Sequence, residues 1–470
     1  MLTVYFTMVA QKRHLKALAA ITLSAALILI GLPAASGTPS APAVAAGTEE
    51  NPMLWGKQVA ADTGWETFAE ADAFGNLFVV DLPHGTQDDV NVVKYGPDGD
   101  VLWVQPFGMG FEFPYSPWVN LAVDRDGAVY VAGGSSDTMV QRLNPDGTLQ
   151  WTVSFSSEFF QPLHVTVDGS GTVIVATALE AGGIACMGFD AMTGDEQWSR
   201  VFAPGTKMSC EGVSSGTVEG FYLFGGTRDS LPGNTATGSW WDYFIASCDG
   251  DGDIRWIRQD GFSSAETWNE ISDVETDADG NAYFVFWPHS WKYYEPNGQS
   301  KILVKYDKEG AIRGFTPLPR SSSWGNDRLA VDRLQNIYVA SYNFEYVEGP
   351  VSQDFDAFLV KYDRSFDFVY QRTVDPLAGS LAEITSGPNG DLFVLYPLNT
   401  DGFDETSELQ VVKYMGDDYD TDKDGLLDIW ETKGVKLDGQ FLDLPAMGAS
   451  PNHKDIFVEV DWMEGHQPFD

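Results

Sequence analysis

The sequence is short of cysteine and of basic residues, and each shortage argues against a class of protein. Its 470 residues contain three cysteines, Cys186, Cys210 and Cys248. Three are too few for a disulfide-built scaffold, although an oxidising compartment would allow one bridge, and we expect it to join Cys186 to Cys210. Lys and Arg number 28 against 68 Asp and Glu, so the net charge is -40. At this charge nucleic acid and anionic lipid surfaces are poor partners, whereas divalent cations are good ones.

A hydrophobic run of membrane-spanning length is also missing near the N-terminus. The apolar run from Ala17 to Ile30 spans 14 residues, which is short for a membrane span. Three basic residues precede it and a tail rich in Ala, Ser, Gly and Pro follows, which is the layout of a secretory signal peptide. We interpret residues 1–46 as a signal peptide and linker, cleaved near Ala45–Ala46 or earlier near Ser36, with an uncleaved anchor as the alternative. The mature chain is then a secreted bacterial protein, free of the membrane, and we expect a monomer.

Helical periodicity is almost absent before residue 425, and a repeat of short strands takes its place. The first half of each repeat is an apolar strand, an Asp- or Gly-rich turn and a second apolar strand, as in "LAVDRDGAVYVAG". The second half is another hairpin that closes on an aromatic residue, at Trp103, Trp151, Trp198, Trp256, Phe315 and Tyr370. These residues are 47 to 59 positions apart. Four short strands per unit of that length predict the blade of a β-propeller.

The two ends of the repeat region complete each other. The seventh repeat reaches Leu409–Tyr414, but Asp422 stands where its closing aromatic residue is due. An unmatched strand, "MLWGKQVA", places Trp55 48 residues before Trp103. We predict that these two segments pair, because pairing removes two sheet edges that would otherwise invite aggregation. The expected fold is all-β, a seven-bladed β-propeller over residues 53–416 followed by a small calcium-loop and α+β segment. The alternative is a six-bladed ring with stray strands.

The repeat resembles a known family. Its halves match the patterns "VDxxGNvYvaG" and "KyxpdGxxlW" of the bacterial β-propeller repeat (SBBP-like) family across residues 53–414. That family is defined by shape more than by chemistry, so the resemblance implies a fold and no particular reaction.

The aspartates after the last repeat have the spacing of a calcium loop. The stretch "DTDKDGLLDIWE" fits the twelve-residue loop, in which hard oxygen ligands occupy alternate places and a glycine makes the turn. The expected ligands are Asp420, Asp422, Asp424, the Leu426 carbonyl, Asp428 and Glu431. A helix of two turns should follow and stop at Gly434. Residues 417–434 therefore predict a Ca²⁺ site, similar to the loops of thrombospondin type 3 repeats and dockerins.

Residues 435–470 contain a strand pattern, "DIFVEVDWM", from Asp455 to Met463. Together with the calcium loop, this region resembles the beginning of a metallopeptidase-like domain in secreted bacterial proteins. That family carries its zinc ligands in an HExxH helix, and the 470 residues contain no such motif. We expect an incomplete domain here. A truncated metallopeptidase-like protein with an accessory propeller is the first alternative function.

The long loops of the repeats are rich in aromatic residues. Those expected on one face of the propeller are Trp118, Trp240, Trp241, Trp287, Trp291, Tyr294 and Trp324. Exposed rings among polar groups suit stacking on sugars, whereas the alternative is that the rings pack the loops onto one another. We predict a non-catalytic, calcium-binding propeller that binds or displays carbohydrate or a cell-surface protein. The second alternative is a propeller-type polysaccharide lyase or glycosidase.

Overall fold

The computed structural model describes most of the repeat region and part of the C-terminal segment. The described residues are 53–63, 67–81, 90–107, 118–134, 138–155, 163–215, 219–261, 267–290, 301–318, 327–344, 355–374, 383–388, 390–398, 407–416, 421–422, 426–437 and 440–455. All of them belong to the second of two compact units, which begins at Thr48. Within these residues, no helix has the length and apolar character that crossing a membrane requires.

The described strands form seven four-stranded antiparallel sheets. Blade 1 holds β2 (Phe68–Ala71), β3 (Leu77–Asp81), β4 (Val90–Tyr95) and β5 (Val101–Phe107). Blade 2 holds β6 (Trp118–Val123), β7 (Val129–Gly134), β8 (Thr138–Leu143) and β9 (Leu149–Phe155). Blade 3 holds β10 (His164–Val167), β11 (Thr172–Ala178), β12 (Ile184–Asp190) and β13 (Glu196–Phe202). Blade 4 holds β14 (Met208–Ser214), β15 (Phe221–Thr227), β16 (Asp242–Cys248) and β17 (Ile254–Asp260).

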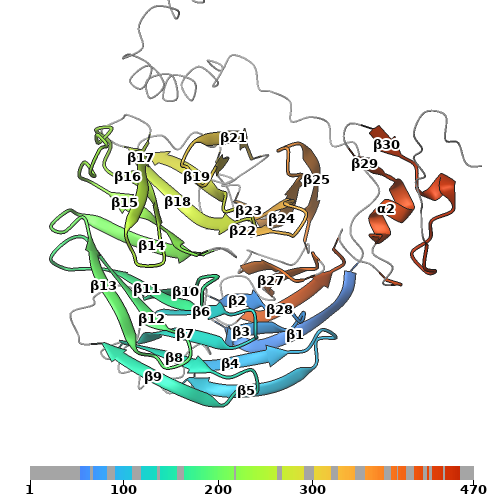
Figure 1. The fold of residues 1–470 in the computed structure, drawn as a ribbon, viewed down its shortest axis with the longest axis horizontal. Helices are drawn as coiled ribbons and strands as arrows, with labels where there is room; N and C mark the ends of the chain where they lie inside the picture. The colour runs from blue at the N-terminus through green and yellow to red at the C-terminus, as the bar shows by residue number, and fades with distance from the viewer. Residues whose placement is uncertain are drawn as a thin grey trace, which may run out of the picture. The chain divides into compact units, whose positions relative to one another are not determined.

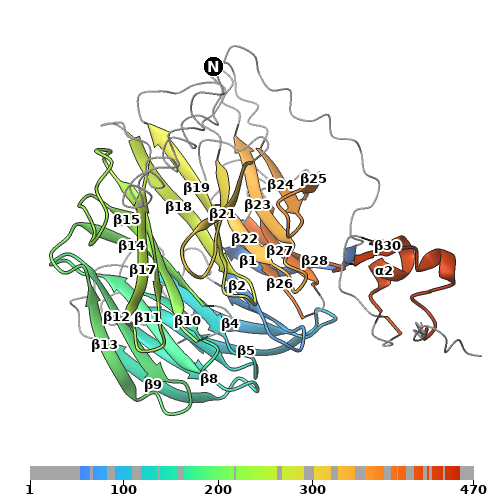
Figure 2. The same cartoon turned by 45° about the horizontal axis from the view of Figure 1, so that its top comes forward.

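The remaining blades continue the same order. Blade 5 holds β18 (Thr267–Thr276), β19 (Ala282–Ser290), β20 (Ile302–Tyr306) and β21 (Ile312–Pro317). Blade 6 holds β22 (Arg328–Val331), β23 (Ile337–Phe344), β24 (Phe355–Tyr362) and β25 (Phe368–Thr373). Blade 7 holds β26 (Glu383–Ser386), β27 (Leu392–Leu398) and β28 (Ser407–Tyr414), with β1 (Met53–Thr63) as its outer strand. The blades are arranged around one axis (Figure 1 and Figure 2), which confirms the predicted seven-bladed β-propeller.

Blade 7 is completed by the first strand of the propeller. Strand β1 runs antiparallel to β28, with Trp55 opposite Lys413 and Gly56 opposite Val412. Figure 1 shows β1, in blue, alongside β28 at the red end of the colour scale. The predicted pairing of the two ends is therefore confirmed, and the six-bladed alternative is wrong.

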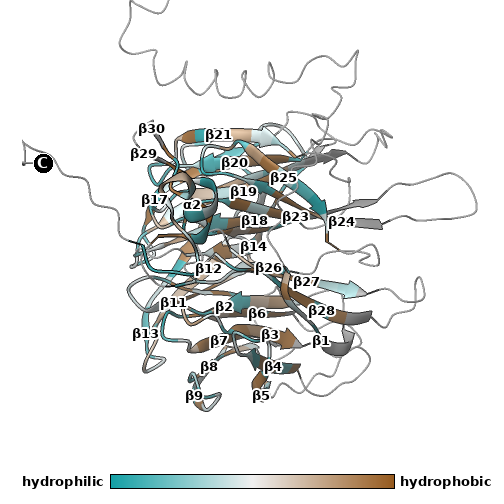
Figure 3. Ribbon diagram, turned by 90° about the vertical axis from the view of Figure 1, so that its right-hand side faces the viewer, coloured by the Kyte–Doolittle hydropathy of each residue, from teal (hydrophilic) through white to brown (hydrophobic). Residues whose placement is uncertain are grey.

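The hydrophobic core lies between neighbouring blades. Between blades 1 and 2, for example, Phe78 and Val92 pack with Leu121 and Val131 in one buried cluster. Figure 3 shows the middle strands β3, β7 and β23 coloured largely as hydrophobic. The innermost strand of each blade contacts the innermost strand of the next blade, in the order β2, β6, β10, β14, β18, β22 and β26, and β26 contacts β2 to close the circle. Each sheet thus buries both faces, which accounts for the nearly continuous apolar runs of its middle strands.

Many of the acidic residues are used in the tight turns. In the β2–β3 turn, Asp72 Oδ1 accepts the backbone N–H groups of Phe74 and Asn76, each at 2.9 Å. Asp277 does the same in the β18–β19 turn for Asp279 and Asn281, at 3.0 and 2.9 Å. A short acceptor side chain can close such a turn where a longer one cannot. These carboxylates therefore stabilise hairpins.

In five of the seven blades, a tryptophan that closes the repeat ties its blade to the next one. Its indole N–H donates to the carbonyl of the following blade's tight turn: Trp55 to Pro97 (2.8 Å), Trp103 to Pro145 (3.0 Å), Trp151 to Ala191 (3.0 Å), Trp198 to Gly250 (2.7 Å) and Trp256 to Lys308 (2.7 Å). In blade 5 the prediction that Phe315 closes the repeat is wrong by one position. Gly314 lies opposite Lys305, in the register of the tryptophans, and Phe315 is 45% exposed.

A small segment follows the propeller in sequence. Its helix α2 (Asp428–Lys433) stops at Gly434, as predicted. Strands β29 (Val435–Leu437) and β30 (Gln440–Leu442) pair with each other, and a 3-10 turn, η1, covers Pro445–Met447. Most of the strand predicted from Asp455 to Met463 lies outside the described residues.

We predict that Trp55→Ala lowers the free energy of unfolding by about 2 kcal/mol, because it removes a partly buried indole and its hydrogen bond at the closure of the ring. The midpoint of urea unfolding, followed by circular dichroism, measures this change. The neighbouring Leu54→Ala removes a side chain that is 40% exposed and should change stability by no more than about 0.5 kcal/mol. Equal effects of the two substitutions would contradict a special role for the closing indole.

Candidate functional site

The predicted aromatic face is only partly within the described residues. Trp240 is 56% exposed, Trp241 is partly buried and Trp287 is buried. The Arg228 guanidinium lies 4.7 Å from the Trp241 ring centroid, and the Lys301 ammonium lies 5.3 Å from that of Trp287. Trp291, Tyr294, Trp324 and the side chain of Trp118 lie outside the described part of the chain. Among the described residues of the set, Trp240 alone presents a well-exposed ring.

The loop that carries Trp240 is held by a network of hydrogen bonds. It joins β15 to β16, and the β16 residue Asp242 accepts the backbone N–H of Thr237 at 2.8 Å and the Gln259 amide at 2.9 Å. Gln259 Oε1 in turn accepts the backbone N–H of Leu231 at 2.8 Å. These bonds fix both halves of the loop to blade 4. Trp240 is thereby presented on a rigid support.

The cysteine prediction is wrong. Cys186, Cys210 and Cys248 are all free and buried in one apolar cluster of blades 3 and 4. Burial raises the pKa of each thiol well above its usual range, so the reactive thiolate is disfavoured. The three residues act as small hydrophobic side chains.

Four of the six expected calcium ligands are within the described residues. Asp428 is the first residue of α2, and Glu431 lies one turn further along, 2% exposed. Thr421 donates two hydrogen bonds to the Asp428 carboxylate, one from its backbone N–H at 2.8 Å and one from its hydroxyl at 2.6 Å. Asp422 and Leu426 are also described, whereas Asp420 and Asp424 are not. Within the described part of the chain, no three His, Cys, Asp or Glu side chains form a metal-binding group.

The axis of the propeller holds carboxylates that the sequence patterns did not indicate. They come from the innermost strands: Glu70 from β2, Asp273 and Glu275 from β18, and Glu383 from β26. Two of them bind the backbone of the next blade's innermost strand. Glu70 accepts the backbone N–H of Val123 in β6 at 2.8 Å, and Asp273 accepts that of Leu329 in β22 at 2.9 Å. The only sequence signal is the presence of an acidic residue in each of these inner strands.

These carboxylates are strongly perturbed. Burial raises the pKa of Glu70 from 4.5 to about 8, and the neighbouring Glu383 adds to the shift. Burial likewise raises the pKa of Glu383 to about 8, although Arg328, 3.4 Å away, opposes this. Glu275 is raised well above its ordinary pKa by burial and by Asp273, Glu70 and Glu383. Glutamates from blades 1, 5 and 7 therefore influence one another across the axis, and protonation keeps them neutral at mildly acidic pH.

The fold places the chain among β-propeller repeat proteins. Residues 88–266 match a family model described as outer membrane protein assembly factor BamB, which covers less than half of the chain. A search of the curated proteins finds no match.

Several solved structures are similar at low sequence identity. BamB from Moraxella catarrhalis is 13% identical with a TM-score of 0.42, covering 78% of this chain and 100% of that one. A protein of unknown function from Bacteroides caccae is 12% identical with a TM-score of 0.40, covering 66% and 97%. Chaetomium thermophilum Raptor is 9% identical with a TM-score of 0.49, covering 78% of this chain and 29% of that one.

We predict that Glu70→Gln stabilises the protein at pH 8 by at least about 1 kcal/mol and has little effect at pH 4. The folded chain holds this proton more tightly than the unfolded chain, because the pKa is about 8 instead of 4.5. The stability linked to it is complete below pH 4.5 and is lost as the pH rises towards 8. Urea unfolding at the two pH values measures the change, and exposed Asp98→Asn is the control. A shift of equal size at both pH values would refute the prediction.

Proposed function

We propose that this chain is an exported, non-catalytic binding protein of the bacterial cell envelope, whose propeller recognises a ligand and whose residues 417–434 bind Ca²⁺. The signal-like layout of residues 1–46 supports export. The match of residues 88–266 to a family described as an outer membrane assembly factor supports the cell-envelope setting and a binding role.

We infer which side of the propeller recognises the ligand from the connections between its strands. Connections between the first and second strands, and between the third and fourth, are tight turns closed by their own aspartates, such as Asp168 and Asp363. The connections between the second and third strands leave from the other side of each blade, and the one in blade 4, between Thr227 and Asp242, carries Trp240. A rigid support with an exposed ring among polar groups suits stacking on a sugar or on a partner's side chain.

The calcium part rests chiefly on the position of Glu431. In twelve-residue calcium loops, the ligand at position 9 lies at the start of the following helix. The ligand at position 12, a glutamate, lies one turn into that helix. Asp428 and Glu431 occupy those positions in α2, and Glu431 is buried. A carboxylate ligand of an enclosed ion is shielded from water, and the burial of the Glu431 side chain fits that role. Asp420 and Asp424 would complete the oxygen set by their spacing in the sequence.

Calcium titration by calorimetry tests this assignment. We expect one Ca²⁺ per chain with a Kd at or below about 10⁻⁴ M. Glu431→Gln and Asp424→Ala should each weaken binding at least about tenfold, because each removes a charged ligand. The exposed Glu180→Gln keeps the loop intact and should bind as the unmodified protein does. Absence of heat from the unmodified protein would reject the site.

Glycan screening tests the recognition side. We expect the protein to retain a glycan, and Trp240→Ala to weaken its binding roughly tenfold without lowering Tm, because the substitution removes a stacking ring that supports no core. Met192→Ala removes an exposed side chain from a tight turn and is the control. If no glycan is retained, or if both variants bind equally well, the carbohydrate part of the proposal is wrong.

A further inference from the structure

The junction between blades 5 and 6 departs from a pattern that five other junctions share. At those five, a tryptophan of one blade lies over a glycine in the next blade's tight turn, as Trp256 lies over Gly310. Here Gly314 stands in the tryptophan register, and Phe366 stands in place of the turn glycine. Phe366 adopts the left-handed conformation (φ 67°) that the turn imposes. At this junction the glycine is therefore in the outer strand of blade 5 and the aromatic residue is in the tight turn of blade 6, the reverse of the other five.

The exchange leaves the junction incompletely filled. The Phe366 ring lies against Gly314 and stacks on Tyr283, with 6.1 Å between ring centroids and 17° between planes. A phenyl ring is smaller than an indole and has no N–H to donate. Among the described residues, no side chain donates to the Arg364 carbonyl, which occupies the position that accepts the indole N–H elsewhere. An open pocket of about 460 Å³ lies beside Gly314 and Phe366, and its charged lining residues are Lys305, Asp307, Glu309, Arg313 and Arg364.

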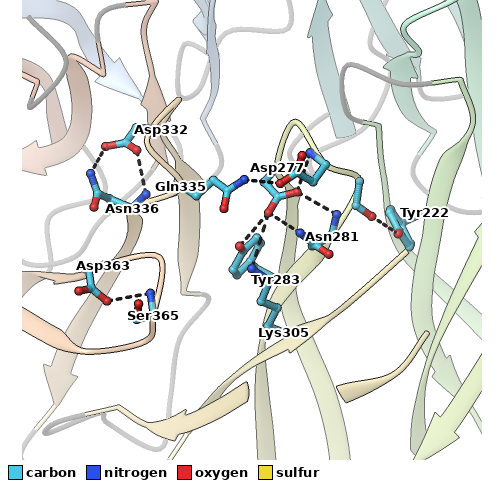
Figure 4. Close-up of polar contacts among 12 residues, drawn as sticks. Tyr222, Asp277, Asn281, Tyr283, Lys305, Asp332, Gln335, Asn336, Asp363 and Ser365 are labelled. Carbon is cyan, nitrogen blue, oxygen red and sulfur yellow. Dashed lines mark hydrogen bonds and ion pairs between the residues drawn. The ribbon is translucent and has the colours of Figure 1, made fainter. Parts of the chain in front are cut away.

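Hydrogen bonds hold the β18–β19 turn, which contributes Asn281 to the pocket (Figure 4). Asp277 Oδ2 accepts the Asn281 amide at 2.7 Å and the Tyr283 hydroxyl at 2.9 Å. The Gln335 amide crosses from blade 6 to Asp279 at 2.7 Å. On the other side, the Tyr222 hydroxyl reaches from blade 4 to the Gly280 carbonyl at 2.7 Å. This wall of the pocket is therefore fixed by bonds within the protein, which lowers the entropic cost of ordering it when a ligand binds.

Two of the three cations in the lining are already paired. Lys305 lies 3.7 Å from Asp277, and Arg313 Nε donates to Asp307 at 2.6 Å. Arg364 and Glu309 remain. Both are exposed, and within the described residues neither has an opposite charge at ion-pair distance.

We propose that this pocket binds a zwitterion of amino-acid or short-peptide size, with its carboxylate on Arg364 and its ammonium on Glu309. The two charges belong to different walls, since Glu309 is in the β20–β21 turn of blade 5 and Arg364 in the β24–β25 turn of blade 6. A net charge of -40 repels free anions, whereas a zwitterion carries no net charge. Charge-assisted bonds to both ends favour it over a neutral polyol. The proposal uses neither the calcium loop nor Trp240.

Calorimetry on the full chain tests the pocket with four probes: alanyl-alanine, its N-acetyl form, its C-terminal amide and glucose. We expect alanyl-alanine to bind, and each blocked form to bind at least about tenfold more weakly. Glu309→Gln should weaken the binding of alanyl-alanine and remove the difference in affinity between it and its N-acetyl form. Arg364→Gln should also weaken the binding of alanyl-alanine, and should remove the difference in affinity between it and its C-terminal amide. These paired losses assign each end of the ligand to one wall.

Matched controls come from the neighbouring turns. Lys308→Gln and Asp251→Asn make the same charge changes outside the pocket and should bind normally; Asp251 is the counterpart of Glu309 in blade 4. The double variant Gly314→Trp/Phe366→Gly restores the arrangement found at five other junctions, so it should fold and lose binding. The proposal is overturned if no probe binds, if glucose or a blocked form binds as well as the dipeptide, or if the controls weaken binding equally.

Discussion

The whole ring depends on the backbone pairing of β1 with β28. Without it, blade 7 would have three strands and an open edge, and blade 1 would lose the indole that lies over its tight turn. The pairing joins residues at opposite ends of the repeat region; the Lys413 ammonium, for example, reaches the Pro97 carbonyl across 316 positions. The entropy of closing so long a loop grows slowly with its length, so one strand pair with good core contacts suffices to close the circle.

Within that closed ring, composition follows from geometry. Aspartates of the tight turns accept backbone N–H groups, which uses part of the large acidic excess in local structure. Tryptophans recur because an indole can cover a turn and donate to its carbonyl at once. Where blade 5 has Gly314, Phe366 of the next blade supplies the ring, but a phenyl group cannot reproduce the hydrogen bond. The acids at the axis differ in kind, because burial raises the pKa of Glu70, Glu275 and Glu383.

Local and repeated features could be predicted from the sequence, and features made by distant residues could not. Seven repeats, with an unmatched strand before the first and a missing fourth strand in the last, were sufficient to predict the closure at Trp55. The register of blade 5 was missed because Phe315 directly follows Gly314 and imitates the expected aromatic residue. The axial glutamates escaped notice because their significance arises only where strands of three blades meet. The expected cysteine bridge was wrong because buried thiols in one cluster need not be bonded. The calcium loop depends on spacing alone, so it could be proposed without a fold.

The direction of the indole contacts gives the ring a mechanical polarity. In five blades the outer strand holds the turn of the blade that follows it, and the strand that holds blade 1 is the first of the propeller. Tension applied at the N-terminus would therefore strip β1 from β28 and release blade 1 in the same event. Tension at the C-terminal side of blade 7 acts on β28, which is flanked by strands on both sides. A molecule tethered by its N-terminal segment would consequently open at its seam under load, while the blades opposite the seam kept their contacts.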